Sequence, residues 1–241
     1  MDIVYFLKQR HKLIKFYYDN SVEPFREIQR KIDLGLQPFD MPEYDESGEP
    51  AYLDEWMDAE TAVQLSGVAC ISMLSDTLKL YFRSLERRVI GFVVSSDFKA
   101  FAKKNGFVEA YKGCLGEILK TDWSDCPVQF NVIEQVVHAR NRGQHGDDIT
   151  SVDIAHDLNT LAKHPQPFFA SELETKIWVE HGGGGSSIFA PKIEITRENL
   201  FAAIAEIEQL ADWIEGRMDQ AWQWRASAMS KVGTATDEPT S

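Results

Sequence analysis

The sequence predicts a mainly α-helical protein with one small β-hairpin near residues 172–196. Most segments place apolar residues at the three- and four-residue spacing of amphipathic helices. The two-residue alternation that is typical of strands falls only within 172–195. The chain has 241 residues and an apolar fraction of 44%, which is enough material for a full hydrophobic core.

The N-terminal segment, residues 1–37, is expected to be helical and to pack on the rest of the bundle. Apolar side chains recur from Ile3 to Leu36 at close to helical spacing. Pro24 lies within this pattern, where proline either begins a new helix or kinks an existing one.

Residues 38–58 are expected to form an exposed acidic loop. The stretch 38–60 contains nine Asp and Glu residues without a single Lys or Arg, and prolines and a glycine interrupt its first half. Two interpretations remain: a solvated connector, which the composition favours, or a phosphate mimic that guards a basic site.

The clearest helix is predicted at 59–90, where a broad apolar stripe ends in Arg83, Arg87 and Arg88. Cations stabilise the C-terminus of a helix, which is the simpler explanation of these arginines, and contact with an RNA backbone is the functional alternative.

The remaining predicted elements follow in chain order. They are helices at 97–120 divided near Asn105-Gly106, a helix after Pro127, a short helix from Ser151 to Lys163, strands at 172–180 and 188–195 around a glycine turn at 182–185, a long helix opened by Thr196, and a disordered tail at 230–241.

Composition limits the classes of function. The formal charge of −13 argues against a protein that coats nucleic acid non-specifically, although a local basic cleft stays compatible with it. Three widely spaced cysteines without a CxxC pair argue against a disulfide framework or a zinc site. The sequence shows neither a membrane-spanning run nor a signal peptide at its start, so we expect a cytoplasmic protein without membrane contact.

The densest polar chemistry lies at 136–148, at the end of an apolar run that predicts a helix. Gly143 and Gly146 would allow this helix to loosen or end there. An ordinary polar helix end is the simpler interpretation, but six polar side chains of catalytic or ligand-binding type stand within eight positions: His138, Arg140, Asn141, Arg142, Gln144 and His145.

The six residues from Arg140 to His145 resemble the Arg-x4–6-His signature of the HEPN superfamily, including the polar residue that the family favours after the arginine, here Asn141. The resemblance covers about residues 60–225 and implies an up-and-down helical bundle, assigned here to residues 59–229, with the β-hairpin as an insertion. Many HEPN domains are metal-independent endoribonucleases that act as homodimers, with the motifs of two chains facing each other. Others lack catalysis and bind nucleotides or protein partners.

The residue types suit metal-independent RNA cleavage. A histidine can accept the proton of the 2′-hydroxyl or donate one to the leaving 5′-oxygen, and an arginine can stabilise the charged phosphorane. We therefore expect Arg140, His145 and Asn141 to be catalytic, with Asn141 orienting His145 or binding phosphate. Candidates for substrate binding are Arg142, Gln144 and His138, although packing is the alternative for His138. The expected products are a 2′,3′-cyclic phosphate and a 5′-hydroxyl, and no metal or cofactor is predicted.

The spacing of the motif imposes a geometric condition. Arg140 and His145 diverge by about 140° on a straight helix, and Arg140 aligns better with Gln144. The pair converges only if the helix ends near Gly143 or if two chains each contribute one group. Asp147 and Asp148 would repel a nearby phosphate, which counts against a tight RNA site.

The expected partners are RNA, a second copy of the chain, and an antitoxin or regulatory protein. The family makes a toxin–antitoxin or anti-phage role plausible. One alternative is a non-catalytic HEPN-like module that binds a nucleotide or a protein. A helical scaffold is another, and a metal hydrolase built on His156-Asp157 ranks last because the upstream and downstream ligand pattern is missing.

Overall fold

The computed structural model describes residues 2–41, 48–144, 154–182 and 189–235, with side chains up to residue 228. These residues form nine α-helices and one π-helical turn, without a β-strand, so the predicted mainly α fold is confirmed. The elements are α1 (Ile3–Asp33), α2 (Leu53–Ser84), η1 (Leu85–Val89), α3 (Phe98–Asn105), α4 (Phe107–Leu119), α5 (Phe130–Gln144), α6 (Leu158–Lys163), α7 (Glu172–Glu180), α8 (Arg197–Glu215) and α9 (Met218–Ala235). No described helix combines the length and the apolar composition that a membrane span requires.

The first two helices differ in detail from the sequence prediction. α1 continues through Pro24 without a break. α2 begins at Leu53, so the last six residues of the predicted acidic loop are helical. Asp54 and Glu55 stand in the first turn of α2, where carboxylates interact favourably with the helix dipole, and this explains the early start. Residues 42–47 of the predicted loop lie outside the described part.

The predicted strand at 172–180 is wrong, because these residues form α7. Ser171 caps the helix by accepting a hydrogen bond from the Glu174 amide at 3.2 Å. Ser171 and Glu174 have the spacing of a capping box, a helix signal that outweighs the local alternation of apolar residues. Residues 189–195 make one isolated bridge, Ala155 to Lys192, so the described residues contain no hairpin.

The C-terminal helix is longer than expected. α9 continues to Ala235, and the first six residues of the predicted disordered tail are therefore helical. The remainder, 236–241, lies outside the described residues.

The chain divides into two compact units, which combine segments from distant parts of the sequence. The first unit comprises Met1–Arg10, Asp76–Glu134 and Ile204–Ser241, and the second comprises His11–Ser75 and Gln135–Ala203. The sequence prediction instead divides the chain at residues 37, 58 and 229. Neither unit is a continuous stretch, so each depends on contacts between residues at least 60 positions apart.

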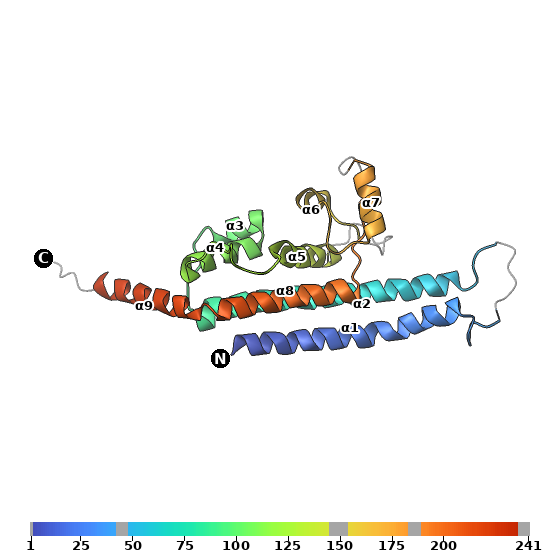
Figure 1. Ribbon diagram of the computed structural model, residues 1–241, viewed down its shortest axis with the longest axis horizontal. Coiled ribbons are helices and arrows are strands. Elements are labelled where there is room, and N and C mark those ends of the chain that lie inside the picture. The colour runs from blue at the N-terminus through green and yellow to red at the C-terminus, as the bar shows by residue number, and fades with distance from the viewer. Residues whose placement is uncertain (1, 42–47, 145–153, 183–188, 236–241) are drawn as a thin grey trace. The chain divides into compact units, whose positions relative to one another are not determined.

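Aromatic side chains build much of the core of the first unit. The Phe82 ring of α2 stacks on Tyr111 of α4 with centroids 4.8 Å apart, and Phe107 meets Phe82 edge-on. Trp123 stacks on Trp213 at 5.0 Å. α3 and α4 lie against one another in this unit (Figure 1). Offset and edge-on contacts of this kind add stabilisation beyond simple burial.

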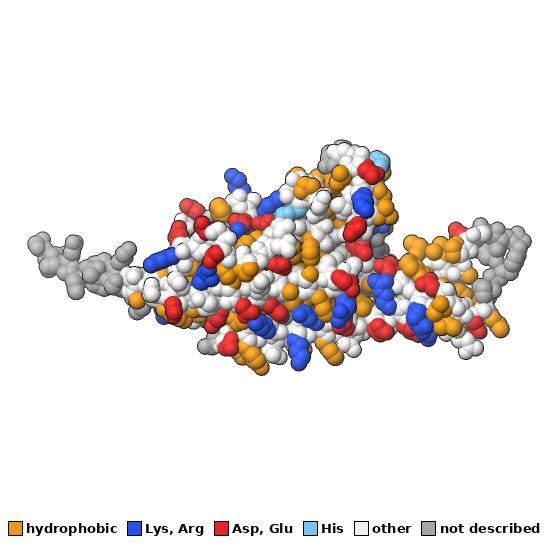
Figure 2. Space-filling model, in the orientation of Figure 1, with side chains coloured by type: hydrophobic (Ala, Val, Ile, Leu, Met, Phe, Trp, Pro, Cys, Tyr) orange, Lys and Arg blue, Asp and Glu red, His pale blue; other side chains and the backbone are white. Residues whose placement is uncertain are grey.

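In the second unit, α1 and α2 lie side by side (Figure 1). Gly67 of α2 makes room for the segment before α8, because a Cβ atom at this position would lie 2.5 Å from the Cβ atom of Ile195. Exposed hydrophobic side chains gather where α1 ends and α2 begins (Figure 2), and they include Leu34, Met41 and Met57. The segment 38–58, predicted to be an exposed acidic loop, thus also presents apolar surface through Met41 and Met57.

Candidate functional site

The motif lies on the last turns of α5, whose opposite face is buried. Gly143 does not end this helix, which continues to Gln144. A Cβ atom at Gly143 would lie 2.5 Å from Cγ1 of Val68, so the glycine allows close packing of α5 on α2. The described part of α5 ends at Gln144, one residue beyond Gly143, so the convergence of Arg140 and His145 at a helix end stays a prediction.

Arg140 and Asn141 form one side of the motif. The Arg140 Nη1 atom donates a hydrogen bond to Oδ1 of Asn141 at 3.3 Å. Arg140 is half-buried, whereas Asn141 and Gln144 are exposed. His145 lies outside the described residues, as do Asp147 and Asp148, so the distance between Arg140 and His145 stays a prediction.

His138 and Arg142 share a different face of α5, because residues four positions apart align on a helix. The Arg142 Nε atom donates to the carbonyl oxygen of Ala155 at 3.1 Å. The His138 ring lies 6.1 Å from the His164 ring, measured between centroids. This face of α5 therefore holds the chain between Ala155 and His164, which is a structural role beside the predicted substrate-binding one.

His156 and Asp157 follow in that segment, and both have hydrogen-bond partners within the chain. His156 is only 4% exposed, and its Nε2 atom lies 2.9 Å from the Phe169 carbonyl oxygen, to which it donates as N–H. Burial lowers the pKa of His156, which favours the neutral ring. Asp157 caps α6 by accepting hydrogen bonds from the amide and hydroxyl of Thr160 at 2.9 and 2.6 Å.

The Asp157 cap gives a pH-dependent prediction. Burial raises the pKa of Asp157, but the Thr160 hydrogen bonds and the charges of His138 and Arg142 outweigh it, so the pKa lies below the usual value. The stability gained from the ionised cap is then complete above about pH 4, the ordinary aspartate range, and is lost as the pH falls through the lower folded-state pKa. Asp157→Ala should cost about 1 kcal/mol at pH 7 and progressively less in acid.

Thermal unfolding of wild type and Asp157→Ala between pH 7 and pH 3 measures this effect. Asp157→Asn is the matched control, since asparagine also caps helices but cannot titrate. A stability difference between wild type and Asp157→Ala that stays constant down to pH 3 would contradict the prediction.

A second cluster of chemically active side chains lines a cleft of about 310 Å³ in the second unit. Its walls carry three carboxylates from three separate segments, namely Glu60, Glu174 and Glu194, with Lys192 beside them. Sequence reasoning missed this cluster. More than 100 positions separate Glu60 from the other two glutamates, so no local spacing brings them together.

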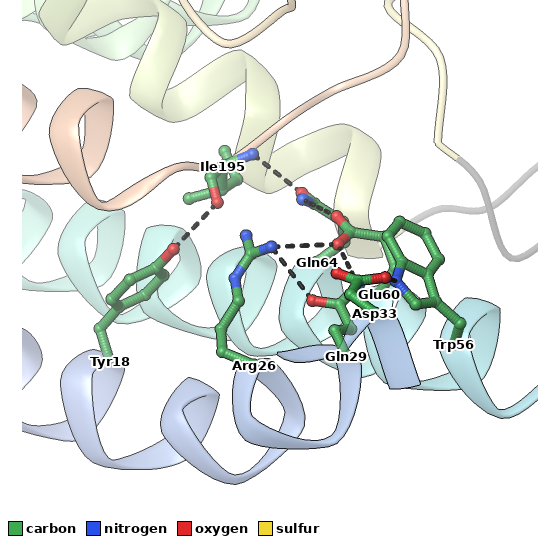
Figure 3. Close-up of polar contacts among 8 residues, drawn as sticks. All are labelled: Tyr18, Arg26, Gln29, Asp33, Trp56, Glu60, Gln64 and Ile195. Atoms are coloured by element: carbon green, nitrogen blue, oxygen red, sulfur yellow. Dashed lines mark hydrogen bonds and ion pairs between the residues drawn. The ribbon is translucent and has the colours of Figure 1, made fainter. Parts of the chain in front are cut away.

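A polar network between α1 and α2 fixes one wall of this cleft (Figure 3). Glu60 accepts hydrogen bonds from Gln29 at 2.9 Å and Gln64 at 3.0 Å, and Arg26 lies 3.3 Å away. Gln64 in turn accepts the amide of Ile195 at 3.0 Å, and the Tyr18 hydroxyl donates to the Ile195 carbonyl oxygen at 3.3 Å. The network holds Glu60 in place and joins α1, α2 and the segment that leads into α8.

The electrostatics of this cleft suit a cation and oppose a phosphate. Burial raises the pKa of Glu194, and the charges of Glu174 and Glu60 raise it further, as expected where carboxylates repel one another. Burial also acts to raise the pKa of Glu60, but the hydrogen bonds from Gln29 and Gln64 and the Arg26 charge bring it below the usual range. Among the described residues, no group of three His, Cys, Asp or Glu side chains is arranged to hold a metal ion.

The acidic cleft lies close to the end of α5. Val68 and Ile154 line it, and the same two side chains are nearest to a Cβ atom placed at Gly143. A negatively charged cleft near the motif weakens the attraction of this side of α5 for RNA. It is instead complementary to a basic side chain of a partner.

Comparisons of the chain with protein-family models, with curated proteins and with solved structures found no match. The resemblance to the HEPN signature therefore depends on the residues from Arg140 to His145 themselves. The proposed function rests on the chemistry of these side chains.

Proposed function

We propose that the protein is a metal-independent endoribonuclease of HEPN type, with a composite active site at the interface of a homodimer. The observation that carries the proposal is the hydrogen-bonded pair Arg140–Asn141 in the final turns of α5, which precedes His145 by four residues in sequence. An arginine held by an amide supplies the cation that RNA cleavage needs, and a histidine at the next positions of the sequence supplies a proton-transfer group.

The reaction divides between two copies of the motif. One His145 imidazole accepts the proton of the 2′-hydroxyl, whose oxygen then attacks the adjacent phosphorus. The Arg140 guanidinium stabilises the additional negative charge on the phosphorane. The imidazolium of the second His145 donates a proton to the 5′-oxygen as the P–O5′ bond breaks, and the products are a 2′,3′-cyclic phosphate and a 5′-hydroxyl.

The hydrogen bond from Arg140 to Asn141 refines the expected role of Asn141. Its Oδ1 atom accepts from Nη1 of Arg140, so the amide positions the guanidinium. The two sequence-based expectations for Asn141, orienting His145 or binding phosphate, stay predictions because His145 lies outside the described residues. Gln144 is exposed near the end of the same helix, where it can contact RNA beside the reacting phosphate.

The test is cleavage of a mixed RNA pool in EDTA by wild type, Arg140→Ala and His145→Ala. Wild type should cleave, and each variant should lose most of the activity while keeping the helical circular dichroism signal of wild type. Arg30→Ala and His181→Ala are matched controls, because both residues are exposed and lie outside the motif. RNA cleavage that survives both motif substitutions would contradict the proposal, and so would a wild-type protein that does not cleave RNA.

The biological setting forms part of the same proposal. A toxin–antitoxin or anti-phage role in the cytoplasm, and an antitoxin or regulatory partner, follow from the HEPN resemblance. A ribonuclease that acts on cellular RNA requires such control, because unregulated cleavage would damage the host.

A non-catalytic binding module is the second candidate, and the acidic cleft favours it. Glu60, Glu174 and Glu194 form a site for a basic side chain close to the end of α5. Arg142 also donates a hydrogen bond to the Ala155 carbonyl oxygen, so one arginine of the motif makes a structural contact. Absence of EDTA-resistant cleavage, together with capture of a basic peptide that Glu194→Gln weakens, would favour this second candidate.

A further inference from the structure

Four arginines surround a groove in the first unit, away from the α5 motif in sequence. Arg10 comes from α1, Arg83 from α2, and Arg87 and Arg88 from η1. The groove has a volume of about 450 Å³. Its other lining residues are mainly apolar: Ile3, Phe6, Leu7, Leu80 and Tyr81, with Thr77 and Ser84.

The groove is a strongly cationic surface on a chain of net charge −13. Among the residues that the structure describes, no aspartate or glutamate lines it. Arg87 pairs with Glu86 at 3.6 Å, and within the described part of the chain Arg10, Arg83 and Arg88 form no ion pair. Unneutralised arginines attract phosphate groups, to which the planar guanidinium can donate two hydrogen bonds.

Stabilisation of the helix end explains only part of this cluster. Arg83, Arg87 and Arg88 stand at the end of α2 and in η1, where a cation compensates the helix dipole. Arg10 does not share that position, since it lies well inside α1. The wider π-helical turn, closed by the Ile90 amide on the Leu85 carbonyl oxygen at 2.9 Å, is a feature that is frequent at functional sites.

Exposed aromatic side chains accompany the arginines. Phe6 lines the groove and is 57% exposed, and the adjacent Tyr5 is 53% exposed. Their rings meet edge-on with centroids 5.4 Å apart. A cationic groove with an exposed aromatic ring is the combination by which proteins bind single-stranded nucleic acid, because phosphates pair with arginine and bases stack on the ring.

We propose that this groove binds single-stranded RNA, with phosphates on Arg10, Arg83, Arg87 and Arg88 and a base on Phe6. The choice of RNA over DNA rests on the proposed ribonuclease function, whereas the phosphate and base contacts do not. The groove would hold a substrate strand by its backbone without reading its sequence.

The experiment measures binding of a fluorescent single-stranded RNA by anisotropy, in an Arg140→Ala background that prevents cleavage. The test variant is Arg83→Gln/Arg87→Gln/Arg88→Gln. The matched control is Lys99→Gln/Lys103→Gln/Lys104→Gln, which removes the same charge from exposed positions of α3 in the same unit. Phe6→Ala tests base stacking, and Arg10→Gln provides a single change on another helix.

The arginine variant should bind at least about tenfold more weakly near 0.1 M salt, and its dependence of log K on log salt should be shallower by about 2 for three lost phosphate contacts. The lysine control should bind like the Arg140→Ala parent. Phe6→Ala should weaken binding about fivefold or more, as the loss of one stacked base does. Circular dichroism confirms that each variant is folded.

Equal weakening by the arginine and lysine variants would overturn the proposal, because net charge would then explain the binding. Undetectable RNA binding would overturn it, as would binding by the groove to anionic lipid vesicles in place of RNA. Failure of the ribonuclease proposal is distinguishable, because that failure removes EDTA-resistant cleavage and leaves the anisotropy result unchanged.

Discussion

A mixture of the Arg140→Ala and His145→Ala proteins should cleave RNA faster than either variant alone, although more slowly than wild type. Each single substitution should lower the cleavage rate about 100-fold or more, the usual cost of losing a general acid–base or a charge-stabilising group. When subunits exchange freely, about half of the dimers pair one chain of each kind. Such a heterodimer retains one Arg140 and one His145 in the shared cleft, so the base and the phosphate-binding cation are present together. The second His145 is missing, and water must supply the proton of the leaving 5′-oxygen.

Differently tagged variants allow the heterodimer to be purified and its EDTA-resistant cleavage measured directly. The control is a heterodimer of wild type with the double variant Arg140→Ala/His145→Ala, in which the surviving pair comes from one chain. The homodimer of Arg140→Ala and the homodimer of His145→Ala set the background rate of cleavage. A mixed dimer as inactive as its parents would rule out a site composed from two chains.

Phe82→Ala should destabilise the protein by about 3–5 kcal/mol, the usual cost of removing a buried aromatic ring. Phe82 is 2% exposed, stacks on Tyr111 and meets Phe107 edge-on, so its removal leaves a cavity between α2 and α4. A loss of this size is a large part of the 5–15 kcal/mol that stabilises a typical domain.

Urea unfolding followed by circular dichroism measures this cost. Phe101→Ala is the matched control, since Phe101 lies on α3 in the same unit but is 49% exposed. It should cost less than about 1 kcal/mol, in keeping with a surface substitution. Comparable losses in the two variants would show that the Phe82 stack is not a principal element of the core.

The candidate site was only partly predictable from the sequence. The motif helix, with Arg140 and Asn141 near its end, followed from an apolar period and a group of polar residues. The engagement of Arg142 by Ala155 did not follow, because that contact depends on how the chain turns after α5. The cleft of Glu60, Glu174 and Glu194 was equally inaccessible, since its members come from distant segments.

Two further features show how local patterns compete. The alternation of apolar residues at 172–180 predicted a strand, while Ser171 and Glu174 have the spacing of a capping box and Ser171 caps the helix. The helix formed because the cap satisfies its first free amides, and no described strand is present to pair with an extended segment. Gly143 meets two demands at once: it lies in the last turn of α5, where the sequence predicted that the helix loosens or ends, and its missing side chain lets Val68 approach.

By itself, the sequence determined the helical class of this protein, because the apolar period of each long segment dictates which face must leave water. It also determined which residues have the chemistry for phosphate contact, including Arg140 and the arginines at the end of α2. Only the tertiary structure decided which of them share a surface: Arg10 joins Arg83 in one groove, and three glutamates gather in another. The physical reason is that periodicity acts within one helix, whereas a binding surface is set by packing between segments that the chain order does not bring together.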